Sequence, residues 1–235
     1  MFETHPHFHR YSNDSSEIIL WKYMDFFKFM YLLRNEKLFF LRTDKFSDKY
    51  EGFMRKLRAE DFNSPVTPVV LTRMDEMYEK VKQFTFVNCW HESNFENMLM
   101  WDNYSDAMGG IAIKTTLEKL QNSIKDERTV YGSPIVYGKE PERGNSFSPI
   151  IYKKEWFMGE NEYRLFVVDN GFHNPQKTCL DSADVSREIS ISTDILVDEL
   201  YFHPKTEEWV KTTCRELVEQ VNPKMEILNS LILLS

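Results

Sequence analysis

The chain has 235 residues, of which 42% are hydrophobic, and its 18 Phe, 11 Tyr and 5 Trp are enough for a sizeable core without disulfide staples. This content argues against intrinsic disorder. Acidic residues outnumber basic ones by 37 to 29, and the net charge of -8 gives no general reason to expect tight, nonspecific nucleic-acid binding.

The cysteines and the N-terminal sequence indicate a cytoplasmic protein. Cys89, Cys179 and Cys214 are widely spaced and form no C-x-x-C pair, which argues against a thiolate zinc site and favours reduced thiols. We expect no secretory signal, because residues 1–10 lack a basic region followed by an apolar run. We expect no membrane partner, because no stretch reaches about 18 uninterrupted apolar residues. Residues 1–17 are expected to form an N-terminal tail and residues 18–235 a single globular domain.

Strand and helix patterns follow one another irregularly along the chain. Apolar, β-branched and aromatic runs predict strands at 18–24, 38–41, 84–90, 111–114, 130–137, 164–168, 189–193, 197–202 and 225–234. Helical spacing predicts helices at 26–35, 71–82, 97–104, 117–124 and after Pro204, with a further charged helix at 53–63. Because the elements do not alternate strictly, we expect a compact α+β domain with a central mixed or antiparallel sheet flanked by short helices.

Several helices carry recognisable caps and apolar stripes. The expected N-caps are Asp25, Thr116 and Thr206. The stripe of the first helix comprises Phe26, Phe29, Met30 and Leu33, widened by Phe27, and that of the last helix comprises Val210, Thr213, Leu217 and Val221.

The most informative segment of the chain is 159–168, which reads GENEYRLFVV. Side chains alternate along a strand, so Glu160, Glu162 and Arg164 are expected to share one face. Three charges on one face are expensive to bury unless they pair. The segment is therefore either a Glu–Arg ladder on a solvated face or the polar floor of a cleft.

Three further groups of residues have the chemistry of a site. Lys22 and Tyr23 lie in an apolar strand, where the lysine either extends from an edge or faces a ligand. The polar turn with Arg42, Asp44, Asp48 and Glu51 either binds a metal or phosphate or consists of solvated and capping residues.

The third group lies where a predicted strand ends in a loop, a common position for sites. Its His91 is a candidate general base, a metal ligand or an ordinary surface histidine. Trp101 and Tyr104 are candidates for an aromatic wall around a planar ligand, although core packing is the favoured interpretation for Trp101.

Several familiar signatures are missing. The sequence contains no GxGxxG or GxxxxGK[ST] phosphate loop, no HExxH and no GxSxG elbow. This removes the ordinary Rossmann, P-loop, zincin and α/β-hydrolase interpretations.

A set of short motifs, taken in order, resembles a bacterial family of proteins with a domain of unknown function. The motifs are LWKYM at 20–24, LFFLRTDKFSD at 38–48, YEG at 50–52, CWH at 89–91, Met100-Trp101 with Tyr104, GIAI at 110–113, Trp156, ENEYR at 160–164, His203-Pro204 with Trp209, and Asn229-Ser230. The resemblance covers roughly residues 18 to 231 and implies no settled activity.

The order of elements is also similar to the plan of ADP-ribosyltransferases, in which a late Glu-x-Glu strand contacts the nicotinamide ribose of NAD. This similarity implies that Glu162 is the catalytic carboxylate, with Glu160 as its neighbour. The chain departs from that plan in its first strand, where Lys22 and Tyr23 stand in place of the usual Arg or His. Arg42 and Thr43 only loosely match the Ser or Tyr of the second strand.

Three hypotheses follow from these residues. In the first, an NAD-consuming transferase-like enzyme uses Glu162 for catalysis, Glu160, Arg42 and Lys22 to orient phosphate or ribose, and Tyr104 or Trp90 to stack on nicotinamide. In the second, Asp44, Asp48, His91, Glu160 and Glu162 bind a divalent metal in a hydrolase or nuclease, with Arg164 or Arg42 holding a phosphate.

The third hypothesis is a non-catalytic binding module of a defence or toxin-type system, with a protein partner that the sequence does not identify. The carboxylates of the 160–164 face distinguish the hypotheses. If they pair beneath packed side chains, the binding module is favoured, whereas an open pocket with unpaired carboxylates favours either enzyme.

Overall fold

The computed structural model describes residues 2–3, 15–46, 65–138, 147–174, 176, 180–181 and 183–232. Outside these residues lie most of the expected N-terminal tail, the expected 53–63 helix, Asp48, Glu51 and Cys179. No helix of the described part is long and apolar enough to cross a membrane.

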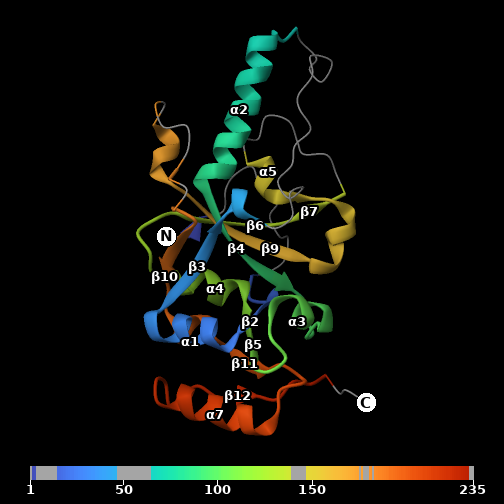
Figure 1. Ribbon diagram of the computed structural model, residues 1–235, viewed down its shortest axis with the longest axis vertical. Coiled ribbons are helices and arrows are strands. Elements are labelled where there is room, and N and C mark those ends of the chain that lie inside the picture. Colours follow the sequence, from blue (N-terminus) through green and yellow to red (C-terminus); the bar gives the residue numbers. More distant parts are fainter. Residues whose placement is uncertain are drawn as a thin grey trace.

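Helices and strands mix along the chain, as the α+β prediction requires (Figure 1). The helices are α1 (Phe26–Asn35), α2 (Pro68–Phe84), α3 (Met98–Tyr104), α4 (Leu117–Ser123), α5 (Ser148–Ile151), α6 (Thr193–Leu196) and α7 (Glu208–Glu219), with 3-10 turns η1 (Thr43–Lys45), η3 (Glu155–Glu160) and η4 (Asn170–His173). The strands are β1 (Phe2–Glu3), β2 (Ile19–Asp25), β3 (Lys37–Arg42), β4 (Thr85–Glu92), β5 (Gly110–Thr116), β6 (Val130–Pro134), β7 (Val136–Tyr137), β8 (Tyr152–Lys153), β9 (Glu162–Val168), β10 (Ser186–Ser190), β11 (Glu199–Phe202) and β12 (Ile227–Leu228).

Within the described residues, ten strands form one mixed sheet, which confirms the expected fold class. Its main path runs β1-β6-β9-β4-β2-β5-β11-β12, and β3 joins β4 to β10 beside that path. Most pairings are antiparallel, while the short end strands β1 and β12 pair in parallel. Figure 1 shows α2 and α7 at opposite ends of the molecule.

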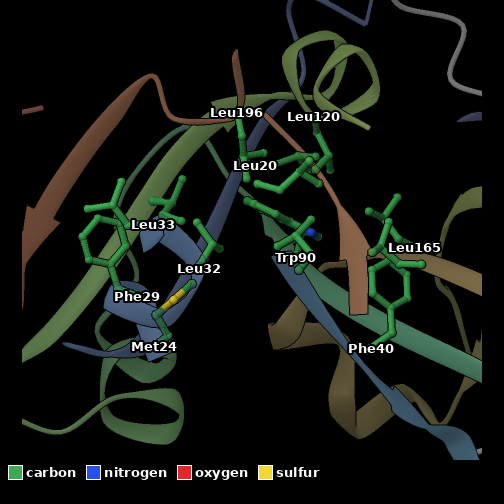
Figure 2. Packing of buried hydrophobic residues seen from close by; sticks show 14 of the residues in the cluster. Leu20, Met24, Phe29, Leu32, Leu33, Phe40, Trp90, Leu120, Leu165 and Leu196 are labelled. Atoms are coloured by element: carbon green, nitrogen blue, oxygen red, sulfur yellow. The ribbon is translucent and has the colours of Figure 1, made fainter. Parts of the chain in front are cut away.

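The main core lies on the face of the sheet that α1, α4, α6 and α7 cover. Figure 2 shows Met24, Phe29, Leu32 and Leu33 packed together, with Trp90 farther along the same cluster. On the other face, Trp101 of α3 is fully buried against Trp21 and Tyr23 of β2. The expected core role of Trp101 is therefore confirmed.

Several local predictions were wrong, and packing explains each. Phe27 is 85% exposed, because the buried stripe of α1 runs through Leu32 instead. In α7 the expected Val210 and Val221 do pack against the main core, but its centre is formed by Cys214 and Val218, while the expected Thr213 and Leu217 are exposed. Thr206 does not cap α7: the N-cap residue is Glu207, and the Thr206 hydroxyl donates to the Ala107 carbonyl.

The sheet forks at β4. On one edge β4 pairs with β9 without interruption from Thr85 to His91. On the other edge β3 pairs with Phe86 and Val87, whereas β2 pairs with His91 and Glu92. Because β2 and β3 diverge, the segment 88–90 has no strand partner on this edge. We call this gap the fork.

Candidate functional site

Two side chains take over the backbone hydrogen bonds that the fork leaves unpaired. Lys22 Nζ, from β2, donates to the Cys89 carbonyl at 3.0 Å. Asn88 Nδ2, from β4, donates to the Phe39 carbonyl of β3 at 2.8 Å. Buried peptide groups need such partners, so these side chains hold the fork open without a third strand.

A cavity of about 230 Å³ lies at the fork. Its lining includes the predicted residues Lys22, Tyr23, Trp90, His91, Tyr104, Glu160 and Glu162. Asn88, Cys89, Phe39, Leu41, Phe46, Val87, Trp21 and Met100 complete the lining. Two larger hollows, of about 460 and 530 Å³, contain none of the predicted site residues.

Lys22 is unusual among the charged residues that line this cavity, because no acidic side chain among the described residues pairs with it. In the described part of the chain its ammonium makes no ion pair; its contacts are the Cys89 carbonyl and the Trp90 ring, whose centroid is 5.4 Å away. Burial lowers the pKa of Lys22 from 10.5 to about 8, against the opposing influence of Cys89 and Glu162. The site therefore contains an amine that is partly deprotonated just above neutral pH.

Asn88 presents a second unsatisfied group. Its Nδ2 is occupied by Phe39, but its buried Oδ1 has no hydrogen-bond partner among the described residues. Only 4% of Asn88 is exposed. A buried acceptor without a donor costs about 1–3 kcal/mol. Trp90 Nε1 is also without a described partner, but the indole packs in the main core (Figure 2), so we assign it no ligand.

Glu162 lies at the start of β9, buried rather than on a solvated face. Its carboxylate accepts hydrogen bonds from Arg164 Nε at 2.5 Å and from Arg164 Nη2 at 2.8 Å, and it forms an ion pair with Lys153 Nζ at 2.8 Å. Burial alone would raise the pKa of Glu162, but Arg164 and Lys153 outweigh burial and hold that pKa well below its usual value. Cys89 beside it has a raised pKa, through burial and the nearby Glu162, and stays a thiol.

Glu160 belongs to the same cluster although it is not part of the strand. It ends η3, and the left-handed Asn161 (φ 34°) turns the chain before β9 begins. Lys153 bridges the two carboxylates, with Nζ 2.6 Å from Glu160 Oε2. Glu160 and Glu162 are thus balanced by Lys153 and Arg164, and this wall of the cavity carries no net charge.

Two further contacts of the Arg164 guanidinium explain why this side chain is buried. Its Nη1 donates to the Ile150 carbonyl at 2.7 Å, and the Phe46 ring lies 5.3 Å from the guanidinium carbon. With 1% exposure, Arg164 lies behind Glu162 and not in the cavity lining. The charged ladder predicted for 160–164 is therefore paired, but beneath packed side chains.

Both ring nitrogens of His91 are occupied. Nδ1 lies 2.6 Å from the Glu160 carbonyl, which only accepts, so Nδ1 carries the proton. Nε2 then accepts from Asn97 Nδ2 at 3.3 Å. Burial lowers the pKa of His91, in keeping with a neutral ring. His91 supports the cavity wall and has no nitrogen left for a substrate.

Aromatic side chains shape the rest of the cavity. The Tyr23 hydroxyl accepts from the Asn97 backbone amide at 2.9 Å, and its ring meets Trp101 edge-on at 4.8 Å. Tyr104 and Phe39 are 46% and 53% exposed and lie at the cavity mouth. A planar ligand would meet aromatic faces here.

Arg42 and Asp44 lie apart from this cavity. Arg42 pairs with Asp44 at 2.7 Å and donates to the Asp181 and Asp184 carbonyls. The described residues contain no group of three or more His, Cys, Asp or Glu that could hold a metal. Asn88 was not among the predicted site residues; its one sequence signal was a polar amide within an apolar strand.

Comparisons of the chain with protein-family models, with curated proteins and with solved structures found no match.

Proposed function

We propose that the protein binds a small planar carboxamide, of the nicotinamide type, in the fork cavity. The proposal rests on two residues of the cavity lining, one with a hydrogen-bond donor and one with an acceptor, and each can make a further hydrogen bond. Lys22 Nζ has only a neutral carbonyl partner, and Asn88 Oδ1 has none among the described residues. A carboxamide offers an oxygen to the first, and its N–H reaches the second once the Asn88 side chain shifts, because Oδ1 is closed off from the cavity in this structure.

Size and shape support the same ligand class. Drug-sized ligands occupy pockets of about 300–1,000 Å³. A cavity of about 230 Å³ suits one ring system with its substituents. NAD would enter with its nicotinamide end while the rest of the dinucleotide stays outside the mouth at Tyr104 and Phe39.

The charge balance favours binding over turnover. An oxocarbenium-like centre is stabilised by a carboxylate whose charge is available. The charge of Glu162 is already taken up by Arg164 and Lys153. Paired carboxylates beneath packed side chains are what we expect of a binding module.

An NAD-consuming transferase is the second candidate, because Glu162 lines the same cavity as Lys22, Tyr23 and Tyr104. It requires an incoming ribose to displace one of the cations from Glu162. Incubation with NAD, followed by quantification of released nicotinamide, tests it. Nicotinamide release that is lost in a Glu162→Gln variant still folded by circular dichroism supports turnover, and an unchanged NAD concentration with a folded wild type rejects it.

The metal-dependent alternative receives no support from the described residues, since Asp44 is held by Arg42 away from Glu160 and Glu162. Asp48 lies outside the described residues.

Calorimetric titration with nicotinamide at pH 7.5 tests the main proposal. For so small a ligand we expect a dissociation constant of about 0.1–1 mM. Lys22→Met should weaken binding by about tenfold or more, whereas the exposed Lys125→Met should leave it unchanged. Benzene, which lacks the carboxamide, should bind at least tenfold more weakly. The absence of heat with millimolar nicotinamide or NAD, from a folded sample, would reject the proposal.

A further inference from the structure

Lys22 has the surroundings of a nucleophilic amine and not only of an anchoring charge. The side chain reaches the fork from β2, its Nζ touches the Cys89 carbonyl, and the Trp90 ring covers one side. No carboxylate of the described residues forms an ion pair with it. A lysine in an apolar pocket without a counter-ion is the arrangement that keeps an amine free to attack a carbonyl carbon.

We propose that Lys22 captures small aldehydes or ketones that enter the fork cavity, as a reversible imine. This proposal rests on the cavity being open to small planar molecules, but not on nicotinamide being its ligand. The cavity, of about 230 Å³, has room for a benzaldehyde-sized molecule beside Nζ.

The reaction balances without an oxidant or reductant. The Nζ lone pair forms a bond to the carbonyl carbon as the carbonyl π bond breaks, the nitrogen gives up one proton, and the oxygen takes up one, which gives a neutral carbinolamine. Loss of the hydroxyl group, with a proton from solvent, releases water and leaves a protonated imine on Lys22. Water reverses the same steps.

The pH dependence of capture follows from the groups that face Lys22. These are Cys89 on β4, Glu162 on β9 and Lys28 on α1. The first two raise the pKa of Lys22 and Lys28 lowers it, but burial has the largest influence and brings it to about 8. At pH 7.5 the neutral amine is therefore populated far more than on a lysine at the ordinary value of 10.5.

Reductive trapping tests the proposal. The full chain is incubated with benzaldehyde and cyanoborohydride, which reduces the imine to a stable benzylamine, and the adduct is located by peptide mass spectrometry. At pH 7.5 we expect Lys22 to react about tenfold or more faster than the exposed Lys125. The ratio of the Lys22 rate to the Lys125 rate at the same pH should be steady below pH 8 and fall above it, because Lys22 is already deprotonated there while Lys125 is still gaining free amine.

Lys22→Met should lose the fast adduct while keeping its circular-dichroism spectrum. Should that variant fail to fold, the labelling pattern of the wild type decides, because peptide mass spectrometry assigns each adduct to its lysine. If the carboxamide proposal also holds, nicotinamide in excess should slow benzylation of Lys22 and leave Lys125 unaffected. Labelling of surface lysines with Lys22 unmodified would overturn the inference, even if nicotinamide binds. A fast Lys22 adduct without nicotinamide protection or binding would support the inference and reject the carboxamide proposal.

Discussion

Lys22→Met should change the way in which stability depends on pH. The pKa of Lys22 is lowered from 10.5 in an unfolded chain to about 8 in the fold. Between these values the unfolded chain binds more protons than the folded one, so the stability of the wild type rises with pH. Because the Lys22 side chain is only partly buried, its ammonium costs at most about 3 kcal/mol at pH 7, and this cost fades as pH rises toward 10.5.

Methionine keeps the length of the side chain and removes the titrating group. The difference in unfolding free energy, variant minus wild type, should therefore fall by about 2 kcal/mol between pH 7 and pH 9.5. At pH 7 the variant should be as stable as the wild type or up to about 2 kcal/mol more stable, because relief of the charge is partly offset by the bond lost at Cys89. Stability gained together with ligand binding lost would mark Lys22 as a functional residue.

Urea unfolding at the two pH values measures this difference, and other titrating groups cancel because both proteins share them. Lys125→Met, on the exposed loop after α4, serves as the control and should show a difference that changes by less than about 0.5 kcal/mol. If the stability difference between Lys22→Met and the wild type is equally independent of pH, the reasoning that Lys22 is a desolvated, weakly basic amine is refuted.

Further predictions concern Glu162 with its two cationic partners, and the turn at Asn161 that precedes it. Glu162→Gln should lower the free energy of unfolding by about 3–5 kcal/mol, because Arg164 and Lys153 lose the charge that balances them in a buried site. The exposed Glu127→Gln, as the control, should lower it by less than about 0.5 kcal/mol. Equal losses for the two variants in urea unfolding would contradict the burial of the Glu162 ion pairs. Because the pKa of Glu162 lies below its usual value of 4.5, this stabilisation is present above that pH and is lost as pH falls below it. The gap between wild type and Glu162→Gln should accordingly narrow from pH 6 to pH 3 in the same assay. Asn161 has a left-handed φ of 34°, so Asn161→Ala should lower the free energy of unfolding by about 1–2 kcal/mol and Asn161→Gly by less. A higher melting temperature for the alanine variant than for the glycine variant would show that the turn is not strained.

Local sequence patterns predicted the elements well where chemistry and packing agree. The strand–helix–strand unit of β2, α1 and β3 follows from apolar periodicity, and the Thr116 cap of α4 from its hydroxyl, which accepts from Lys119 N at 3.2 Å. Patterns failed where tertiary contacts decide. The stripe of α7 includes Cys214, a residue that apolar counting passed over, and Phe27 is exposed because Leu32 points inward in its place.

Seven of the predicted site residues line the fork cavity, whereas Arg42 and Arg164 do not, and the sequence did not predict how these residues are arranged. Alternation along β9 brought Glu162 and Arg164 to one face, yet their burial depends on Phe46 and Ile150, which are distant in sequence. The fork depends on the register of β2 and β3 against β4, which no short motif encodes. Arg42 shows the same limit, since its partners Asp181 and Asp184 come from a distant loop.

The most direct test is a crystal structure of the protein soaked with nicotinamide. The ring should occupy the cavity at the fork, with the carboxamide oxygen about 3 Å from Lys22 Nζ and the carboxamide nitrogen facing Asn88 Oδ1. Nicotinamide bound only outside the fork, or a fork filled by the protein's own side chains, would contradict the assignment of this cavity as a ligand site.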